Sequence, residues 1–206
     1  MRRCVIFLPG ARPPFEPGEG DLLVCADSGY TAIRSMGLTP QILVGDMDSI
    51  SRAELEEAGR LGVEVHVHPR DKDRTDGEIA VDIALSSPIE KLVILGGLHG
   101  RTDHVVSAFL LLQKVPKGMD AELWSGQSRT SLLRGPDRRR FSADLPVASL
   151  LPLGHCAGVS TEGLRWPLNG ESLVPGSTRG VHNEPLAESF EVALESGQLL
   201  VMRCPL

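Results

Sequence analysis

The sequence lacks long apolar runs, closely spaced cysteines and an excess of positive charge. No apolar run approaches the roughly 18 residues that a membrane-spanning helix requires, so no membrane partner is expected. The net charge of −6 argues against nucleic acid as a partner. No CxxC pair occurs, which favours reduced thiols over a disulfide framework or a zinc knuckle at the four cysteines, Cys4, Cys25, Cys156 and Cys204.

Familiar nucleotide-binding and targeting signatures are missing as well. Neither a GxGxxG nor a Walker A sequence occurs, so a nucleotide would have to be held by a different loop. The apolar start of the chain stops at Pro9, which is too short for a signal sequence and predicts the first strand of a cytoplasmic protein. A basic cluster at 138–140 follows Gly-Pro-Asp and is expected to form a solvated hairpin tip rather than a nucleic-acid patch.

Through the first 125 residues, short apolar runs alternate with helical patterns of about ten residues. This alternation predicts parallel strands with right-handed crossovers, in a sheet covered by helices on both faces. Capping-box patterns at Ser51 with Glu54 and at Thr75 with Glu78 indicate where two of the helices begin. The predicted strands lie at about 1–8, 22–26, 42–44, 63–68 and 92–95, and the predicted helices at 30–36, 51–62, 75–85 and 103–114.

From about residue 121 the helical patterns disappear, and short β-type runs separated by Gly and Pro remain. The predicted strands lie at 131–133, 147–153, 158–161, 190–194 and 199–202, and the last two are expected to form a hairpin around 195–198. The expected fold class is α/β, with an N-terminal Rossmann-like parallel sheet over 1–125 and a C-terminal all-β sandwich domain over 126–206.

The most informative segment is 41–50, where an apolar run ends in Gly45, Asp46, Met47 and Asp48. If the chain stays extended there, the carboxylates of Asp46 and Asp48 point the same way, within roughly 7 Å of each other. Such a pair suits Mg²⁺, which is usually held by one or two carboxylates together with substrate phosphates and water. An Asp-rich turn also has a purely local interpretation, because Asp caps helices and accepts backbone N–H bonds.

Further carboxylates follow the other predicted strands. The carboxyl ends of parallel strands lie along one edge, where open α/β sheets bind ligands, so these carboxylates are expected to gather there. So many like charges require a metal and basic groups, which favours a divalent-cation site over a set of unrelated turns. The seven carboxylates are Asp27, Asp46, Asp48, Asp71, Asp73, Asp76 and Asp103.

A phosphate-binding loop is predicted after the strand at 92–95. Gly97 and Gly100 come just before a predicted helix N-terminus, where backbone N–H groups bind phosphate, and Arg101 adds a bidentate donor. Asp103 and His104 follow directly, and Asp103 is expected to hold either Arg101 or the ribose of a nucleotide.

Seven short segments, spread over nearly the whole chain, contain most of these residues and several more polar ones. They are Ala26-Asp27-Ser28-Gly29, Gly45-Asp46-Met47-Asp48-Ser49, Lys72-Asp73-Arg74-Thr75-Asp76, Gly100-Arg101-Thr102-Asp103-His104, Thr161-Glu162-Gly163-Leu164, Gly176-Ser177-Thr178-Arg179-Gly180 and Asn183-Glu184. In the order and spacing of these segments, the chain resembles the thiamine pyrophosphokinase family. The resemblance implies an α/β nucleotide-binding domain, a β-sandwich thiamine-binding domain, a homodimer with thiamine near the subunit interface, and Mg²⁺-dependent transfer of a pyrophosphoryl group from ATP to thiamine.

The resemblance and the chemistry together assign roles. Pyrophosphoryl transfer needs an in-line hydroxyl and neutralised phosphate oxygens rather than a covalent intermediate. The expected catalytic residues are Asp46, Asp48, Asp73, Asp76 and Arg101; Asp46, Asp48 and Asp76 are expected to hold Mg²⁺, and Asp73 or Asp76 to orient or deprotonate the hydroxyl. The co-substrate ATP is expected to contact Asp27, Gly45, Lys72, Thr75, Gly97, Gly100, Arg101, Asp103 and His104.

Thiamine carries a cationic thiazolium ring, which an aromatic face suits. Trp166 is the natural candidate, although a tryptophan in the core of a sandwich explains its presence equally well. The expected thiamine contacts are Trp166, Ser177, Arg179 and Asn183.

Four residues, Ser28, Met47, Gly77 and His182, depart from the usual family pattern. Gly77 lies beside Asp76, so substrate fit and rate are the properties that these departures concern. Two other functions therefore stay open. A metal-dependent phosphotransferase for another small alcohol would keep the Asp and Arg roles, and a non-catalytic nucleotide or thiamine-binding regulator would bind its ligand without releasing AMP.

Overall fold

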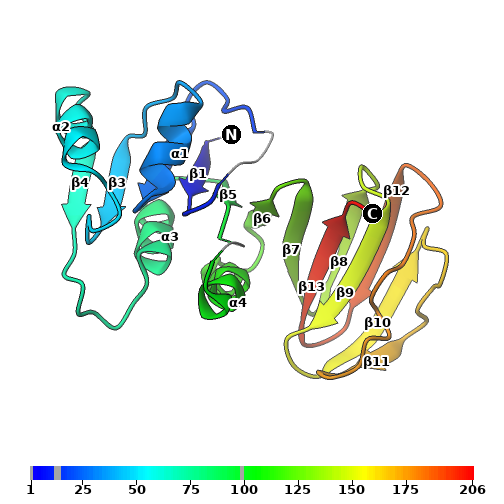
Figure 1. The fold of residues 1–206 in the computed structure, drawn as a ribbon. Coiled ribbons are helices and arrows are strands. Elements are labelled where there is room, and N and C mark those ends of the chain that lie inside the picture. The colour runs from blue at the N-terminus through cyan, green and yellow to red at the C-terminus, as the bar shows by residue number, and fades with distance from the viewer. Residues whose placement is uncertain (1, 12–14, 98–99) are drawn as a thin grey trace. The chain divides into compact units, whose positions relative to one another are not determined.

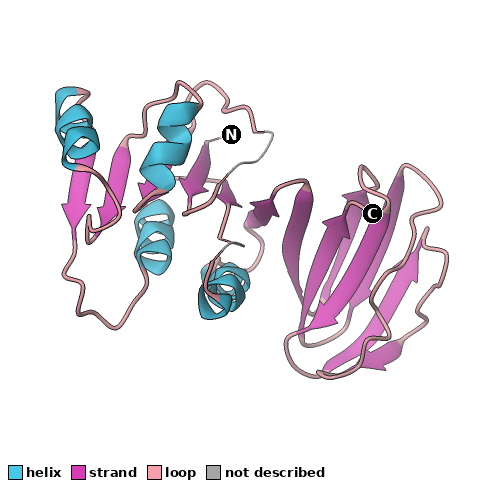
Figure 2. Ribbon diagram, in the orientation of Figure 1, coloured by secondary structure: helices cyan, strands magenta, loops and turns pink. Residues whose placement is uncertain are grey.

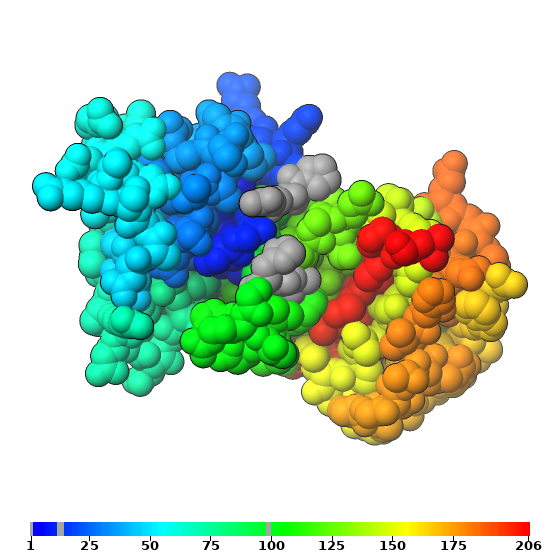
Figure 3. Space-filling view, viewed as in Figure 1, coloured from blue at the N-terminus to red at the C-terminus, as the bar shows by residue number. Residues whose placement is uncertain are grey.

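The computed structural model describes residues 2–11, 15–97 and 100–206, and the chain divides into two compact units, Met1–Gly126 and Gln127–Leu206. Figure 3 colours the surface of the first unit from blue to green and that of the second from yellow-green to red. Within the described residues, no helix is long and apolar enough to cross a membrane.

The first unit is built on a parallel sheet with the strand order β4-β3-β2-β1-β5-β6. Its strands are β1 (Arg3–Phe7), β2 (Leu22–Ala26), β3 (Ile42–Gly45), β4 (Glu64–Val67), β5 (Lys91–Leu95) and β6 (Asp120–Ser125) (Figure 1). The predicted strands of this unit are present, and β6 adds one that the sequence pattern did not reveal. Because all pairings are parallel, the strands end along the same edge of the sheet.

The helices of the first unit are α1 (Gly29–Ser35), α2 (Arg52–Arg60), α3 (Asp76–Ser86) and α4 (Thr102–Leu110). Ser51 and Glu54 make the complete capping box that the sequence predicts for α2. At α3 only the Thr75 half forms as predicted, because the Glu78 carboxylate instead pairs with Lys114. The helix predicted over 103–114 is wrong in its last turn, where the chain tightens into the 3₁₀ turn η1 (Leu111–Lys114) shortly before Pro116.

Helices lie on both sides of this sheet, with α1 and α2 on one side and α3 on the other (Figure 2). Tyr30 and Ile33 of α1 are fully buried in a cluster with Val5 and Phe7 of β1. Alternate residues of β1 point to the opposite face, where Ile6 is also fully buried. Burial on both faces explains why these strands read as continuous apolar runs rather than as alternating patterns.

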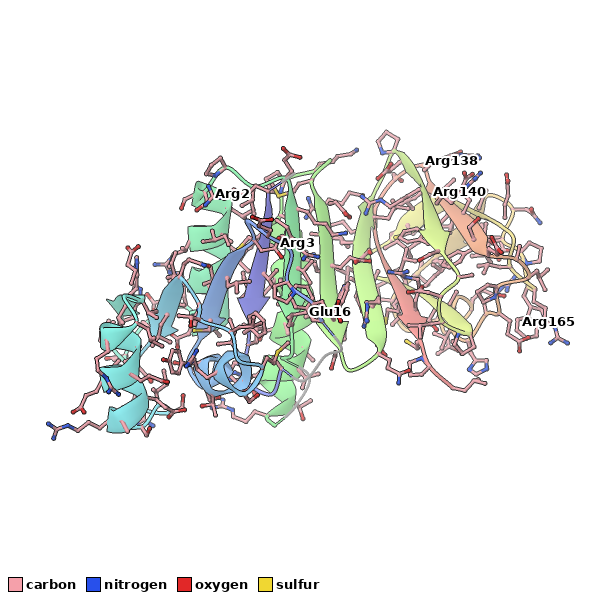
Figure 4. The ribbon with its side chains drawn as sticks, turned by 90° about the horizontal axis from the view of Figure 1, so that it is seen from above. Arg2, Arg3, Glu16, Arg138, Arg140 and Arg165 are labelled. Atoms are coloured by element: carbon pink, nitrogen blue, oxygen red, sulfur yellow. The ribbon has the colours of Figure 1, made fainter. Side chains whose placement is uncertain are left out.

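The segment that enters β2 is anchored on β1 by Arg3. The Arg3 guanidinium lies 4.9 Å from the centroid of the Phe15 ring, pairs with Asp21 and donates to the backbone oxygen of Glu16 at 3.4 Å (Figure 4). Phe15 in turn packs edge-on against Phe7. These contacts attach the described end of the Pro- and Gly-rich stretch to the sheet; residues 12–14 lie outside the described part of the chain.

The second unit contains two groups of antiparallel strands, in the orders β7-β13-β9 and β11-β10-β12-β8. Its apolar core takes side chains from every one of these strands, among them the stacked rings of Phe141 and Phe190, whose centroids are 5.5 Å apart. The strands are β7 (Ser128–Arg134), β8 (Asp137–Ser142), β9 (Val147–Pro152), β10 (Cys156–Glu162), β11 (Glu171–Leu173), β12 (Ser189–Leu194) and β13 (Gln198–Cys204).

The predicted hairpin of the last two strands is wrong. β12 pairs with β10 and β8, whereas β13 pairs with β7 and β9. Between them, the backbone N–H groups of Glu195 and Ser196 both donate to the oxygen of Ala157, and Gly197 adopts a left-handed φ of 103°. The connection therefore carries the chain from one group of strands to the other. A short polar loop between two strands of alternating pattern has the same sequence signature whether the strands pair with each other in a hairpin or belong to different groups of strands.

The basic cluster at 138–140 lies within β8 and not at a hairpin tip. Arg138 forms cross-strand ion pairs with Glu191 of β12 and Glu162 of β10. Figure 4 shows Arg138 and Arg140 in this part of the second unit. Carboxylates of the same group of strands thus compensate the charge of Arg138.

We expect Gly29 to be essential for the packing of α1 on β1. A Cβ atom at Gly29 would lie 2.1 Å from the backbone oxygen of Phe7, which cannot move without displacing the central strand. Gly29→Ala should therefore lower the free energy of unfolding by about 2 kcal/mol or more, measured by urea denaturation. Gly59→Ala in α2 is the matched control, since its Cβ would meet nothing within 4 Å; this variant should gain about 0.5 kcal/mol. Equal stabilities of the two variants would contradict the prediction.

Candidate active site

A pocket of about 310 Å³ opens in the first unit at the carboxyl ends of its strands. Its walls come from the residues after β1, β2, β3 and β5, from the loop before α3, and from α3, α4 and η1. The lining contains three carboxylates, four basic side chains, one histidine and an apolar wall: Asp27, Asp46, Asp76; Arg70, Lys72, Arg74, Arg101; His104; and Leu8, Pro9, Gly77, Gly97, Ala108, Leu111, with Thr75 and Ser107.

Backbone geometry aims Asp27 at the acidic part of this pocket. Directly after β2, Asp27 adopts a left-handed φ of 48°, a conformation that Asp tolerates better than most residues. Its Oδ1 atom then lies where a side chain at Gly45 would be, because a Cβ there would come within 2.0 Å of it. On the neighbouring strand end, Asp46 accepts a hydrogen bond of 2.9 Å from the backbone N–H of Asp48. Gly45 thus admits the first carboxylate, and the turn that follows it orients the second.

The acidic part of the pocket lacks sufficient positive charge. Lys72 pairs with Asp76 at 3.1 Å, and both side chains are largely buried. Among the described residues, the buried Asp27 Oδ1 and Asp76 Oδ1 have no hydrogen-bond partner. Burial, and then the charges of Asp76 and Asp46, raise the pKa of Asp27 to about 7 although Lys72 opposes the shift. The three arginines that line the pocket pair with other carboxylates, Asp48, Asp82 and Asp103, so among the described residues Lys72 is the cation paired with this acidic group, and the pocket is suited to a further cation.

The carboxylates fit a magnesium ion better than a transition metal. Across the described part of the chain, no three His, Cys, Asp or Glu residues form a ready-made ligand cluster. Mg²⁺ does not need one, because it retains water and shares ligands with substrate phosphates. As carboxylates, Asp27 and Asp76 offer each other no donor, and the Asp27 carboxyl lies close enough to Asp76 to hydrogen-bond to it when protonated; this close acidic pair is the observation that favours a hard cation at this place.

Basic residues around the same pocket are placed to receive an anion. Arg101 comes from the loop before α4 and binds Asp103 through two hydrogen bonds of 3.1 and 2.6 Å. This contact lowers the pKa of Asp103, and it shows that Asp103 holds Arg101, one of the two roles that the sequence left open. Arg70 lies 3.4 Å from Asp48. Each arginine therefore has an exposed carboxylate partner that it can exchange for phosphate.

The structure brings together most, but not all, of the predicted nucleotide and metal residues. Those lining the pocket are Asp27, Asp46, Lys72, Thr75, Asp76, Gly97, Arg101 and His104, with Gly45 directly behind Asp27. Those exposed at the surface are Asp48, Asp73, Gly100 and Asp103. The sequence reasoning missed Arg70 and Arg74, which also line the pocket. Their alternation with Lys72 was the available signal, since side chains two apart in an extended loop face the same way.

The departure at Gly77 has a packing explanation. A Cβ there would lie 3.1 Å from Cδ2 of Leu8 and 3.5 Å from Cδ1 of Leu111. These two leucines therefore occupy the space next to the helix backbone, and they form the apolar wall of the pocket together with Ala108. A larger side chain at Gly77 would require both leucines to move.

The second unit has a separate pocket of about 260 Å³, lined by Trp166, Arg179, Val181, His182 and Asn183. Trp166 is 45% exposed, so its interpretation as a core residue is wrong. The guanidinium of Arg165 lies 5.1 Å from the centroid of the Trp166 ring and pairs with Glu184 at 2.8 Å (Figure 4). The ring is thus presented at the surface by a defined local framework.

Asn183 belongs to that framework. Its side chain is buried, accepts from the backbone N–H groups of Trp166 and Glu184, and donates to the backbone oxygen of Trp166 at 2.6 Å. These bonds occupy most of the hydrogen-bonding capacity of the amide, so Asn183 positions Trp166. Ser177 is exposed and accepts from the N–H of Arg179, whose guanidinium pairs with Glu171 at 3.0 Å.

Sequence comparison first assigns the chain to an enzyme class, the pyrophosphokinases. The family model described as "Thiamin pyrophosphokinase, catalytic domain" matches residues 18–123, and "Thiamin pyrophosphokinase, vitamin B1 binding domain" matches residues 140–199. The first match contains most of the pocket of the first unit, and the second contains the whole pocket of the second unit. The chain belongs to the thiamin pyrophosphokinase family.

Similarities to individual proteins support this assignment. The chain is 25% identical to "Thiamine pyrophosphokinase" of Bacillus subtilis, with 90% of this chain and 88% of that protein covered. It is 29% identical to "Thiamine pyrophosphokinase 2" of Arabidopsis thaliana, with 96% and 85% covered. The crystal structure of the Bacillus subtilis thiamine pyrophosphokinase superposes with a TM-score of 0.86 at 24% identity, covering 100% of this chain and 99% of that one. This superposition shows the shared fold.

We expect Asp27 to make stability depend on pH. Because its pKa is raised from the ordinary 3.8 to about 7, the folded state favours the protonated carboxyl. The contribution of Asp27 to stability is therefore complete below about pH 4 and is lost as the pH rises to 7. Asp27→Asn, which stays neutral and tolerates the left-handed backbone, should raise the thermal midpoint at pH 8 by roughly 2–5 °C, and by much less at pH 4, without divalent cations.

The exposed Asp71→Asn is the control and should show no such pH-dependent difference. The measurement is thermal unfolding followed by circular dichroism at both pH values. If the thermal midpoint of Asp27→Asn differs from that of the wild type by the same amount at pH 4 and at pH 8, Asp27 is ionised in the folded protein at little cost, and the prediction is contradicted.

Proposed function

We propose that the protein transfers a pyrophosphoryl group from ATP to the hydroxyl of thiamine, giving thiamine diphosphate and AMP, with Mg²⁺ as the metal. The observation that carries this proposal is the pocket of the first unit, where partnerless carboxylate oxygens and exchangeable basic groups meet in the region that the catalytic-domain model matches. The vitamin B1 binding match over the second unit supports thiamine as the acceptor.

The polar residues of the pocket have separate roles in this reaction. Asp46 and Asp76 would hold Mg²⁺, and the more exposed Asp48 would reach it through water; the ion supplies neutralisation of charge on the phosphate oxygens. Lys72 and Arg101 bind the polyphosphate.

Asp76 is the better candidate for orienting the thiamine hydroxyl. Asp76 lines the pocket and pairs there with Lys72 through Oδ2 at 3.1 Å. Asp73, the other candidate, is exposed to solvent. A carboxylate at hydrogen-bonding distance both orients the hydroxyl in line with the β-phosphorus and can take up its proton as the new P–O bond forms.

We also propose a function for each of the two units. The parallel sheet with helices on both sides supports a Rossmann-like nucleotide-binding domain. The core shared by all strands of the second unit supports a β-sandwich that binds thiamine. The exposed ring of Trp166 suits a cationic thiazolium, with Arg179 and Ser177 nearby in the chain and Asn183 fixing the ring.

We further propose a cytoplasmic homodimer in which the thiamine pocket of one chain serves the nucleotide pocket of its partner. The two pockets belong to separate units of the chain, and a two-fold dimer would create two equivalent composite sites. The four cysteines are free thiols, which is consistent with a reducing compartment.

Neutralising the two carboxylates after β3 should have unequal effects. Asp46 lines the pocket, whereas Asp48 is exposed and paired with Arg70. We expect Asp46→Asn to lower kcat by about 100-fold or more and Asp48→Asn to lower it by about tenfold. The assay measures AMP and thiamine diphosphate with purified protein, ATP, Mg²⁺ and thiamine.

Both variants should remain folded, which thermal unfolding would verify. Near-wild-type turnover by Asp46→Asn at saturating Mg²⁺ would contradict the metal assignment. Release of AMP with a related alcohol but not with thiamine would instead identify a phosphotransferase of different specificity, and ligand binding without any AMP would identify a regulator.

Complementation between two defective chains tests the composite site. We expect Asp46→Asn and Trp166→Ala each to be poorly active at limiting thiamine, and their mixture to regain activity after subunit exchange. Each mixed dimer would contain one intact site, and random pairing makes about half of the dimers mixed, so recovery should approach one quarter of wild-type activity.

Subunit exchange is verified separately, with differently tagged chains. Trp166→Ala is preferred to a change at Asn183, because loss of the buried amide would disturb the local framework. If exchange is complete and activity does not rise, each chain builds its own site.

A further inference from the structure

Arg74, in the loop before α3, lines the pocket of the first unit, but its present partner is Asp82 of α3, which does not line the pocket. Its Nη1 atom donates a single hydrogen bond of 3.2 Å to Oδ2 of Asp82, and the arginine side chain is 53% exposed. A single, solvent-exposed bond of this kind contributes little and exchanges readily. Arg74 can therefore leave Asp82 at small cost when an anion enters the pocket.

Asp82 does not depend on Arg74 alone. Lys114 of η1 lies 3.0 Å from Oδ1 and 3.2 Å from Oδ2 of Asp82, and 2.9 Å from Oε1 of Glu78. These two carboxylates raise the pKa of Lys114, so the ammonium group stays charged. If Arg74 moves away, Asp82 keeps a cationic partner.

We propose that Arg74 is a further phosphate-binding residue of the pocket, and that Lys114 keeps it available by holding its resting partner Asp82. This inference rests on the proposed function, to which it adds a contact to the polyphosphate of the nucleotide. In the absence of nucleotide Arg74 shares Asp82 with Lys114, and in its presence Arg74 binds phosphate while Lys114 retains the carboxylate.

The other basic residues of the pocket are bound in a different way. Lys72 pairs with the largely buried Asp76, so its movement would remove compensating charge from the site itself, whereas Arg70 has the exposed Asp48 as the partner that it would exchange. Arg101 would have to give up both hydrogen bonds to Asp103. Arg74 differs because its partner is neutralised from outside the pocket.

The first test measures binding directly by titration calorimetry with Mg²⁺–ATP and, separately, with inorganic tripolyphosphate and Mg²⁺. Arg74→Gln should weaken both affinities by about tenfold, since each ligand loses one charge-assisted contact. Arg74→Lys should recover part of the loss. Arg52→Gln, on the outer surface of α2 with a 93% exposed side chain, is the matched control and should bind like the wild type.

Unchanged binding by Arg74→Gln would overturn the proposal, and so would a loss confined to ATP, because the contact would then be to the nucleoside. Thermal unfolding verifies that each variant is folded. The readout needs no turnover: if the wild type binds Mg²⁺–ATP but makes no thiamine diphosphate, the proposed function fails while this inference stands. A wild type that binds neither ligand would overturn both.

The second test examines the resting pair. Asp82→Asn should release Arg74 and strengthen ATP binding by up to about threefold, whereas Lys114→Met should weaken it because Asp82 would then retain Arg74. The double variant Lys114→Met with Asp82→Asn should return to at least wild-type affinity. If Asp82→Asn instead weakens binding as much as Arg74→Gln does, Asp82 anchors Arg74 structurally and the exchange is disproved.

Discussion

Uncompensated negative charge at one edge of a parallel sheet is the constraint on which the rest of this structure depends. Three carboxylates, Asp27, Asp46 and Asp76, line one pocket with Lys72 as the cation that pairs with one of them. Burial of the Asp27 carboxyl, together with the charges of Asp76 and Asp46, raises the pKa of Asp27 to about 7. Such an arrangement costs stability in the absence of further positive charge, as expected of a site organised for function rather than for the empty fold.

Local backbone geometry places these charges where they are. The left-handed turn at Asp27 and the absence of a side chain at Gly45 let two neighbouring strand ends approach one another closely. The packing of Leu8 and Leu111 next to Gly77 forms the apolar wall of the same pocket. The pocket thus combines one charged side with one dry side, a combination in which interactions with phosphate are less screened than in open solvent.

Most of the first unit was predictable, because its alternation of apolar runs and helical patterns is local information. The second unit was predicted less well. β12 and β13 are alternating strands on either side of a short loop, and the sequence pattern of such a pair does not reveal that it crosses between two groups of strands. The basic cluster at 138–140 was assigned to a hairpin tip for the same reason, since its carboxylate partners, Glu191 and Glu162, lie on strands distant in sequence.

By itself the sequence determined the class of the fold, the acidic segment at 46–48 and the family, because periodicity, turn residues and motif spacing are properties of neighbouring residues. Only the tertiary structure decided which residues meet. It exposed Asp48 and Asp73, brought Arg70 and Arg74 into the pocket, and left Trp166 at the surface, held by the buried amide of Asn183. The physical reason is that burial and charge compensation depend on contacts between elements far apart in the chain, such as η1 with α3, which no local pattern encodes.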